Sequence, residues 1–194
     1  LISLVIKKQL NEESPETSIK LNFNPTDTIF DVAEKINSVI EENKKEETSN
    51  NADKAVGIFN LCPGFLLRFL VWFLTKLDSI GCLPRIIADL SPFHSSVFVT
   101  DLGSLGVKPV FHHLFEFGTN SIFIAFGIKQ REKNIHKDGS HIISERKTMN
   151  IKIVTDDRIT DGFYFAQAFK LFRSLLQSPE QLELPPEQVI EDIV

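Results

Sequence analysis

The sequence predicts an α+β fold, with a mixed sheet and helices packed on one face. Strand-like and helix-like segments follow one another without strict βαβ alternation, and two amphipathic helical patterns flank the central strands. The chain has 194 residues, of which 42% are apolar, enough for a sizeable core. We therefore expect one domain over 1–194, with an atypical hydrophobic helical segment at 46–90.

The N-terminal segments predict two strands and a helix. The stretches "LISLVIKKQL" and "TSIKLNF" are typical of strands joined by a polar loop. Thr28 and Asp31 resemble a capping box at the start of the helix. Apolar residues at helical spacing then fall on one face of this helix: Ile29, Ala33, Ile36, Val39 and Ile40.

The most hydrophobic stretch is "PGFLLRFLVWFLTKLDSIGCLP". The uncharged run between Arg68 and Lys76 is far shorter than the roughly 20 residues that span a bilayer. We expect a buried helix from Phe65 to Asp78, apolar nearly all round. Three roles are open for the 65–83 segment: a core or interface helix, a partner-binding face, or an in-plane membrane anchor.

The second half predicts more strands and a final helix. "SSVFVTDL" and "NSIFIAFGIKQ" are typical of strands, and "HIISERKTMNIKIVTDD" indicates two strands around a loop. The last helix, "DGFYFAQAFKLFRSLLQ", has an apolar face at helical spacing, which we expect to be buried. That face consists of Phe165, Phe169, Phe172 and Leu176.

Charge and cysteine content exclude some classes of function. The net charge of −5 argues against a nucleic-acid partner, because phosphate binding requires a concentrated basic face. Cys62 and Cys82 show no disulfide or zinc pattern, which favours a reducing, cytoplasmic location. We expect no metal, and membrane contact is not expected either. The chain begins at Leu1 instead of Met, so we expect an N-terminal part to be missing.

Few local motifs carry chemistry. The sequence has no G-x-S-x-G, no phosphate loop and no dinucleotide fingerprint. "ADKA" contains Lys54 in a setting unlike a lipoyl turn, so no lipoyl attachment is expected. His112 and His113 are adjacent in "VFHHLFEF", which on a strand would direct them to opposite faces. They are either ordinary hydrogen-bonded histidines or, for one of them, part of a site.

Two stretches, "VTDLGSLG" and "DDRITDG", together with the order of the elements around them, resemble a known family. A strand that contains "VTDLGSLG" is followed by the strand "SIFIAFG". A further strand ends in "DDRITDG" and is followed by a helix and "SPE". The chain is similar over about 90–187 to the catalytic domain of 2-oxo acid dehydrogenase E2 acyltransferases, which share the chloramphenicol-acetyltransferase-like fold. The resemblance implies that fold, a homotrimer with sites at subunit interfaces, and coenzyme A or acyl-CoA as ligand.

The family motif is D-H-R-x-x-D-G. Its His takes a proton from a thiol that attacks an acyl thioester. Its second Asp orients the turn through a buried ion pair, and its Gly lets the helix begin close to the strand. Asp156, Arg158, Asp161 and Gly162 match this pattern, whereas Asp157 stands where the His belongs.

A second family segment, S-N-L-G, supplies a hydroxyl that stabilises the oxyanion. Thr100 falls at the position of this hydroxyl, and Asp101 replaces the Asn. The resemblance therefore gives Asp157, Thr100, Asp161 and His113 as candidate catalytic residues. Gly162, Arg158 and Asp101 are candidate substrate-binding residues.

The change at Asp157 has a calculable cost. Moving a proton from a thiol of pKa ~8.5 to a carboxylate of pKa ~3.9 is uphill by about 6 kcal/mol. An imidazole of pKa ~6.5 faces only about 3 kcal/mol. The usual acyl transfer is then altered or lost unless His112 or His113 replaces the base, or the site binds a thioester without turnover. The other class of function is a non-catalytic trimeric scaffold that uses 65–83 for a partner or lipid surface.

Replacement of Asp157 by His should create or raise acetyl transfer from acetyl-CoA to a dithiol, because it restores a base matched to a thiol. The rate of thioester formation measures this gain. No gain would mean that the rest of the pocket is absent.

Overall fold

The fold is described from a computed structural model over residues 1–7, 16–45, 63–135 and 142–189. Five strands form one mixed sheet in the order β2-β1-β3-β4-β5. β1 pairs with β2 and β4 with β5 in antiparallel fashion, while β1–β3 and β3–β4 are parallel. The strands are β1 (Ile2–Lys7), β2 (Glu16–Leu21), β3 (Val97–Asp101), β4 (Ile122–Ile135) and β5 (Ile142–Thr155).

Strand register divides the sheet into two faces. Ile19 and Leu21 of β2 are buried on one side, which we call the helix face. Lys20 points to the other side, where its Nζ donates to the carbonyl oxygen of Ala88 at 2.8 Å. Burial lowers the pKa of the Lys20 ammonium, and Asp89 partly offsets this. Phe98 and Phe123 are buried on this second side, which we call the loop face.

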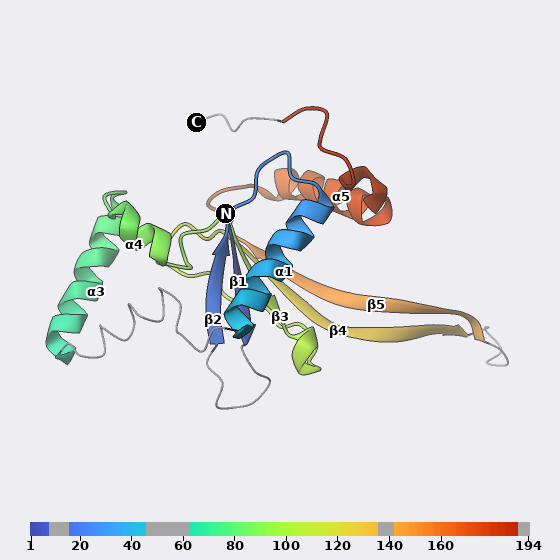
Figure 1. Cartoon of the computed structure of the whole chain (residues 1–194), viewed down its shortest axis with the longest axis horizontal. Helices are drawn as coiled ribbons and strands as arrows, with labels where there is room; N and C mark the ends of the chain where they lie inside the picture. The colour runs from blue at the N-terminus through green and yellow to red at the C-terminus, as the bar shows by residue number, and fades with distance from the viewer. Residues whose placement is uncertain (8–15, 46–62, 136–141, 190–194) are drawn as a thin grey trace.

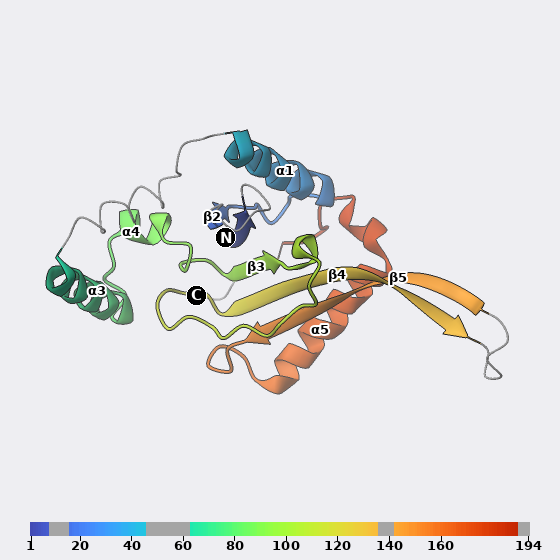
Figure 2. The same cartoon turned by 90° about the horizontal axis from the view of Figure 1, so that it is seen from below.

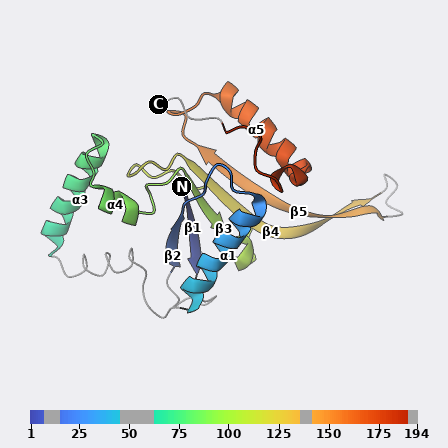
Figure 3. The same cartoon turned by 45° about the horizontal axis from the view of Figure 1, so that its top comes forward.

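Two helices cover the helix face, as the fold class predicts. α1 (Ile29–Lys45) lies in front of the strands at the β2 end of the sheet (Figure 1). α5 (Gly162–Gln177) lies at the other end, beside β5 (Figure 3). The capping box is confirmed: Thr28 N donates to Asp31 Oδ2 at 2.8 Å, and Asp31 N donates to Thr28 Oγ1 at 3.3 Å. The predicted α+β class is thus confirmed.

The strand prediction for the last third was wrong in one respect. Residues 142–155 form one strand, β5, instead of two strands around a loop. β4 and β5 continue past the other strands as a two-stranded arm (Figure 2). The register shifts between Phe126 and Lys129, where a Cβ on Gly127 would lie 2.2 Å from Pro109 Cδ. This bulge therefore requires a glycine.

The loop face is covered by irregular chain. η1 (Gly103–Leu105) follows β3, and residues 107–120 then form neither helix nor strand. Phe115 lies against this face, with its ring centroid 5.7 Å from Phe98 and 4.4 Å from Phe93. Phe98 stacks on Phe123 at 5.1 Å. These four rings, named here the phenylalanine cluster, make the apolar core of this face.

The hydrophobic helix is not buried, contrary to expectation. α3 (Gly64–Ser79) has no buried residue, and with α4 (Arg85–Leu90) it stands to one side of the sheet (Figure 1). An apolar sequence predicts that a helix needs cover, but it does not identify what provides that cover. Cys82, just after α3, is a free and exposed thiol, whereas Cys62 and Lys54 lie outside the described residues.

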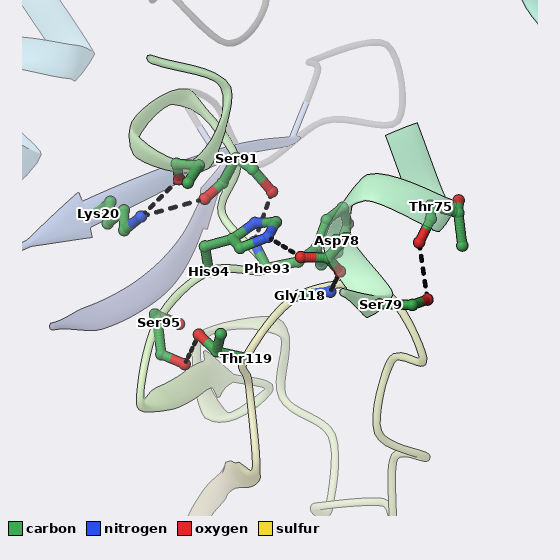
Figure 4. Close-up of polar contacts among 11 residues, drawn as sticks. Lys20, Thr75, Asp78, Ser79, Ser91, Phe93, His94, Ser95, Gly118 and Thr119 are labelled. Atoms are coloured by element: carbon green, nitrogen blue, oxygen red, sulfur yellow. Dashed lines mark hydrogen bonds and ion pairs between the residues drawn. The ribbon is translucent and has the colours of Figure 1, made fainter. Parts of the chain in front are cut away.

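One carboxylate joins α3 to the rest of the chain. His94 Nε2 donates to Asp78 Oδ1 at 3.0 Å, and Gly118 N donates to Asp78 Oδ2 at 2.8 Å (Figure 4). Gly118 has φ +96, and a Cβ there would lie 2.3 Å from Phe93 O, so no other residue fits. Asp78 therefore links the end of α3 to two loops at the end of the sheet.

Asp78→Ala should lower the free energy of unfolding by about 1–3 kcal/mol, because it leaves a buried imidazole and a backbone N–H without an acceptor. Urea denaturation measures the loss. Glu42→Ala, at an exposed position on α1, is the control and should change little. Equal effects of the two substitutions would contradict the role given to Asp78.

Candidate functional site

A cavity of about 330 Å³ lies on the loop face of the central strands. Phenylalanine rings make most of its wall, and the polar groups are few, which is the usual character of a ligand pocket. The polar side chains are Thr100, His112 and His113. The apolar lining comes from Val5, Phe98, Phe111, Phe115 and Phe123.

Thr100 enters this cavity from β3. It pairs with Ala125 of β4, and its side chain lies on the same face as Phe98, two residues earlier. Among the described residues its hydroxyl has no hydrogen-bond partner, so it is available to a ligand. Thr100 therefore brings a hydroxyl to the cavity, from a strand that fixes its direction.

The two histidines share this cavity, which corrects the expectation that they point apart. Residues 112 and 113 are irregular chain instead of a strand, so strand alternation does not separate their side chains. The His112 ring stacks on Phe123 with centroids 4.3 Å apart and planes 16° apart. His112 Nε2 is buried and has no partner within the described part of the chain.

His113 is held in a form suited to accept a proton. Its Nδ1 lies 3.2 Å from the carbonyl oxygen of Leu114. A carbonyl oxygen only accepts hydrogen bonds, so Nδ1 carries the proton in the neutral ring. The lone pair is then on Nε2, the nitrogen that a general base would use.

The "DDRITDG" turn is separate from this cavity within one chain. Asp157 is exposed and follows Thr155, which pairs with Ile122, whereas Thr100 lies level with Lys152 two strands away. Three residues along the strand and two strand spacings place Thr155 roughly 14 Å from Thr100, and Asp157 follows two residues further along the chain. Thr100 and Asp157 do not meet in a single copy of the chain.

Arg158 folds back onto Asp156. Its Nε donates to Asp156 Oδ2 at 2.9 Å, its Nη2 reaches the same oxygen at 2.5 Å, and its backbone N donates to Oδ1 at 2.9 Å. The guanidinium bonds, followed by the backbone bond, lower the pKa of Asp156. Arg158 thus shapes the turn, and it does not line the cavity.

Asp161 and Gly162 differ from what the family resemblance implies. Asp161 is exposed and caps α5, with its Oδ1 accepting from Tyr164 N at 2.8 Å. It forms no ion pair with any described residue, so the expected buried ion pair is wrong. A Cβ on Gly162 would meet nothing within 4 Å, so close approach of helix and strand does not require this glycine.

The glycine with a steric role is Gly103, which sequence reasoning did not single out. A Cβ there would lie 2.6 Å from Gly127 O. Asp101 Oδ1 accepts from Gly103 N at 2.9 Å and closes the turn after β3. Asp101 therefore shapes the end of the strand that carries Thr100, and its carboxylate does not line the cavity.

A second, apolar cavity of about 530 Å³ lies between β5 and α5. The predicted apolar face of α5 lines this cavity, but the face is not fully buried: Phe169 is 46% and Leu176 58% exposed. Phe111 lines both cavities, and Lys152 Nζ lies 4.0 Å from its ring centroid. His136 and His141 lie outside the described residues, which contain no cluster of three metal-ligating side chains.

Comparison with known proteins gives structural likeness only. No family model and no curated protein matches the chain. A probable dihydrolipoamide acetyltransferase from Listeria monocytogenes matches at TM-score 0.47 and 16% identity, over 97% of this chain and 58% of its own. The dihydrolipoamide acetyltransferase of Azotobacter vinelandii matches at TM-score 0.37 and 16% identity, over 61% of this chain and 46% of its own.

The cubic core of a pyruvate dehydrogenase multienzyme complex matches at TM-score 0.37 and 16% identity, over 64% of this chain and 47% of its own. The chain thus spans little more than half of the length of the Listeria protein, and less than half of the others. These superpositions are partial, and none of them assigns a reaction to this chain.

Gly103→Ala should destabilise the fold by about 1–3 kcal/mol, because the new methyl group meets backbone at less than contact distance. Gly162→Ala should be neutral or stabilise by less than about 1 kcal/mol, because Ala favours the helix and has room. Urea denaturation of both variants tests the pair. A larger loss of stability with Gly162→Ala than with Gly103→Ala would instead indicate that Gly162 is needed for the helix to begin close to the strand.

Proposed function

We propose that this chain is a CoA- or thioester-dependent acyltransferase-family protein related to E2 catalytic domains. In this proposal Asp157 no longer serves as base, and His113 takes that role at the loop-face cavity. The observation that carries the proposal is the shared cavity of Thr100, His112 and His113. The motif resemblance in "VTDLGSLG" and "DDRITDG" supports the same family.

The cavity residues have complementary chemical roles. His113 Nε2 accepts the proton of an incoming thiol, and the sulfur then adds to the thioester carbonyl carbon. Thr100 donates a hydrogen bond to the carbonyl oxygen as it becomes negative. When the carbon–sulfur bond of the original thioester breaks, His113 returns the proton to the departing thiolate, which leaves as a thiol. The acyl group has then moved between two sulfurs, with no net change in protons.

The aromatic wall suits the acyl end of the substrate. Phe98, Phe115 and Phe123 exclude water from the thioester, which strengthens the hydrogen bond from Thr100. His112 stacks on Phe123 and brings a buried, unpartnered nitrogen to the same wall. Coenzyme A fits as a ligand whose thiol enters the cavity.

The proposal includes a homotrimer. In the family that the sequence resembles, sites form at subunit interfaces, where one copy brings its strand–helix turn to the hydroxyl of the next. Such an arrangement would place Asp157 of one copy near Thr100 of another. Asp157 then lines the site without serving as base, since a thiol-to-carboxylate proton transfer is uphill by about 6 kcal/mol. The rate should accordingly be lower than with an imidazole at that position.

The competing function is a binding protein that holds an acyl thioester without turnover. It shares the cavity and differs only in whether His113 reaches the thiol. Isothermal titration with acetyl-CoA, together with an assay of acetyl transfer to dihydrolipoamide, separates the two functions. Binding with no transfer at any enzyme concentration favours the binding protein.

His113→Gln should lower acetyl transfer to dihydrolipoamide by about a hundredfold or more, because the amide fills the space but accepts no proton. Thr100→Val should lower kcat by a comparable factor by removing the oxyanion donor. Initial rates of thioester formation measure both effects.

Asp157→Asn is the matched control, since it keeps size and removes only the carboxylate. Its rate should remain within a few-fold of that of the parent protein. A loss with Asp157→Asn that equals the loss with His113→Gln would return the base to the strand–helix turn and refute the assignment of His113.

A further inference from the structure

We propose that the outer face of α3 lies in the plane of a membrane surface that carries anionic lipid. This role is separate from acyl transfer and does not depend on it. It also revises the sequence-based expectation of no membrane contact. The proposal rests on the side chains that α3 leaves exposed, on their charge, and on how the opposite side of the helix is attached to the chain.

The exposed side of α3 is aromatic and continuous. Phe69 is 60% and Trp72 56% exposed, and their ring centroids lie 5.9 Å apart. Phe73 stacks on Phe69 at 6.3 Å. Phe65, one helical turn earlier, is 78% exposed. Large apolar rings gathered at such exposure on one helix mark a binding surface instead of ordinary scatter.

α3 is attached to the rest of the chain near its C-terminal end, through Asp78. The half-buried residues on the side of Asp78 are Leu67, Leu70, Leu74 and Leu77. Asp78 holds His94 and Gly118, and its side chain is only 15% exposed (Figure 4). This attachment fixes which side of the helix points outward, so the aromatic side is presented in one direction.

The charge of α3 selects an anionic occupant. Arg68 and Lys76 are exposed, and eight residues of helix place them about 80° apart, on the aromatic side. The single acid of α3, Asp78, is turned inward to its two partners. The outer face is therefore aromatic and positively charged, with no exposed acid of its own.

This combination fits a lipid surface better than other occupants. No helix among the described residues is long and apolar enough to cross a membrane. A helix with Trp and Phe beside basic residues lies in the interface, with rings among the acyl chains and cations at the headgroups. Arg and Lys stems extend along apolar surface while their charges stay in water. A two-fold contact between two copies would instead bring like charges together.

The net charge of −5 does not prevent this contact. At physiological ionic strength charges are screened beyond about 8 Å, so Arg68 and Lys76 dominate what the headgroups sense. Each basic residue near an anionic surface raises the partition coefficient about fivefold. We therefore expect weak binding to neutral lipid and stronger binding when anionic lipid is present.

Trp72 is the single tryptophan of the sequence, so intrinsic fluorescence reports directly on α3. Titration of the full chain with phosphatidylcholine vesicles containing phosphatidylserine should shift its emission to the blue and sediment the protein with the vesicles. Pure phosphatidylcholine vesicles should give a much smaller shift. Replacing both Arg68 and Lys76 by Ala should lower the partition coefficient into anionic vesicles by more than tenfold.

Phe69→Glu should abolish the shift and the sedimentation. Phe30→Glu is the matched control, because Phe30 is 63% exposed on α1, and it should bind as the parent protein does. Failure of the parent protein to shift or sediment with anionic vesicles would overturn the proposal. A blue shift that grows with protein concentration in the absence of lipid would also overturn it, in favour of a second copy of the chain.

Discussion

The phenylalanine cluster on the loop face is the constraint on which the candidate site depends. Phe93, Phe98, Phe115 and Phe123 pack against one another and hold the irregular 107–120 chain against β3 and β4. This packing directs His112 onto Phe123 and brings His113 to the same cavity as Thr100. Without these ring contacts no backbone pairing would hold residues 110–116 near the strands, because the segment forms neither helix nor strand.

The elements of the fold follow from local patterns in the sequence, and their environment does not. Alternating apolar residues predicted β3, and the Thr28–Asp31 box marked the start of α1 within a residue. The hydrophobic stretch around α3 also predicted a helix correctly. Its exposure was not predictable, because a helix that is apolar nearly all round shows only that cover is needed.

The candidate site was predictable in part. The resemblance in "VTDLGSLG" pointed to Thr100, which the cavity contains. The resemblance in "DDRITDG" predicted the roles of its residues less well, because Asp161 caps a helix and Gly162 has open space around it. The joint position of His112 and His113 depends on ring stacking between segments far apart in sequence, and strand periodicity assigned them wrongly. A third histidine, His94, lies in no sequence motif, although it pairs with Asp78 in the attachment of α3.

Gly118 connects the attachment of α3 to the irregular 107–120 chain that carries His112 and His113, because its backbone N donates to Asp78. Acyl transfer as proposed here requires that His113, and not the strand–helix turn, meets the thiol. Histidine side-chain NMR during a titration with coenzyme A tests it most directly, with signals assigned by single substitution. The His112 and His113 signals should shift while that of His94 stays fixed. Unchanged His112 and His113 signals, with backbone amide shifts confined to residues 156–162 in the same titration, would contradict it.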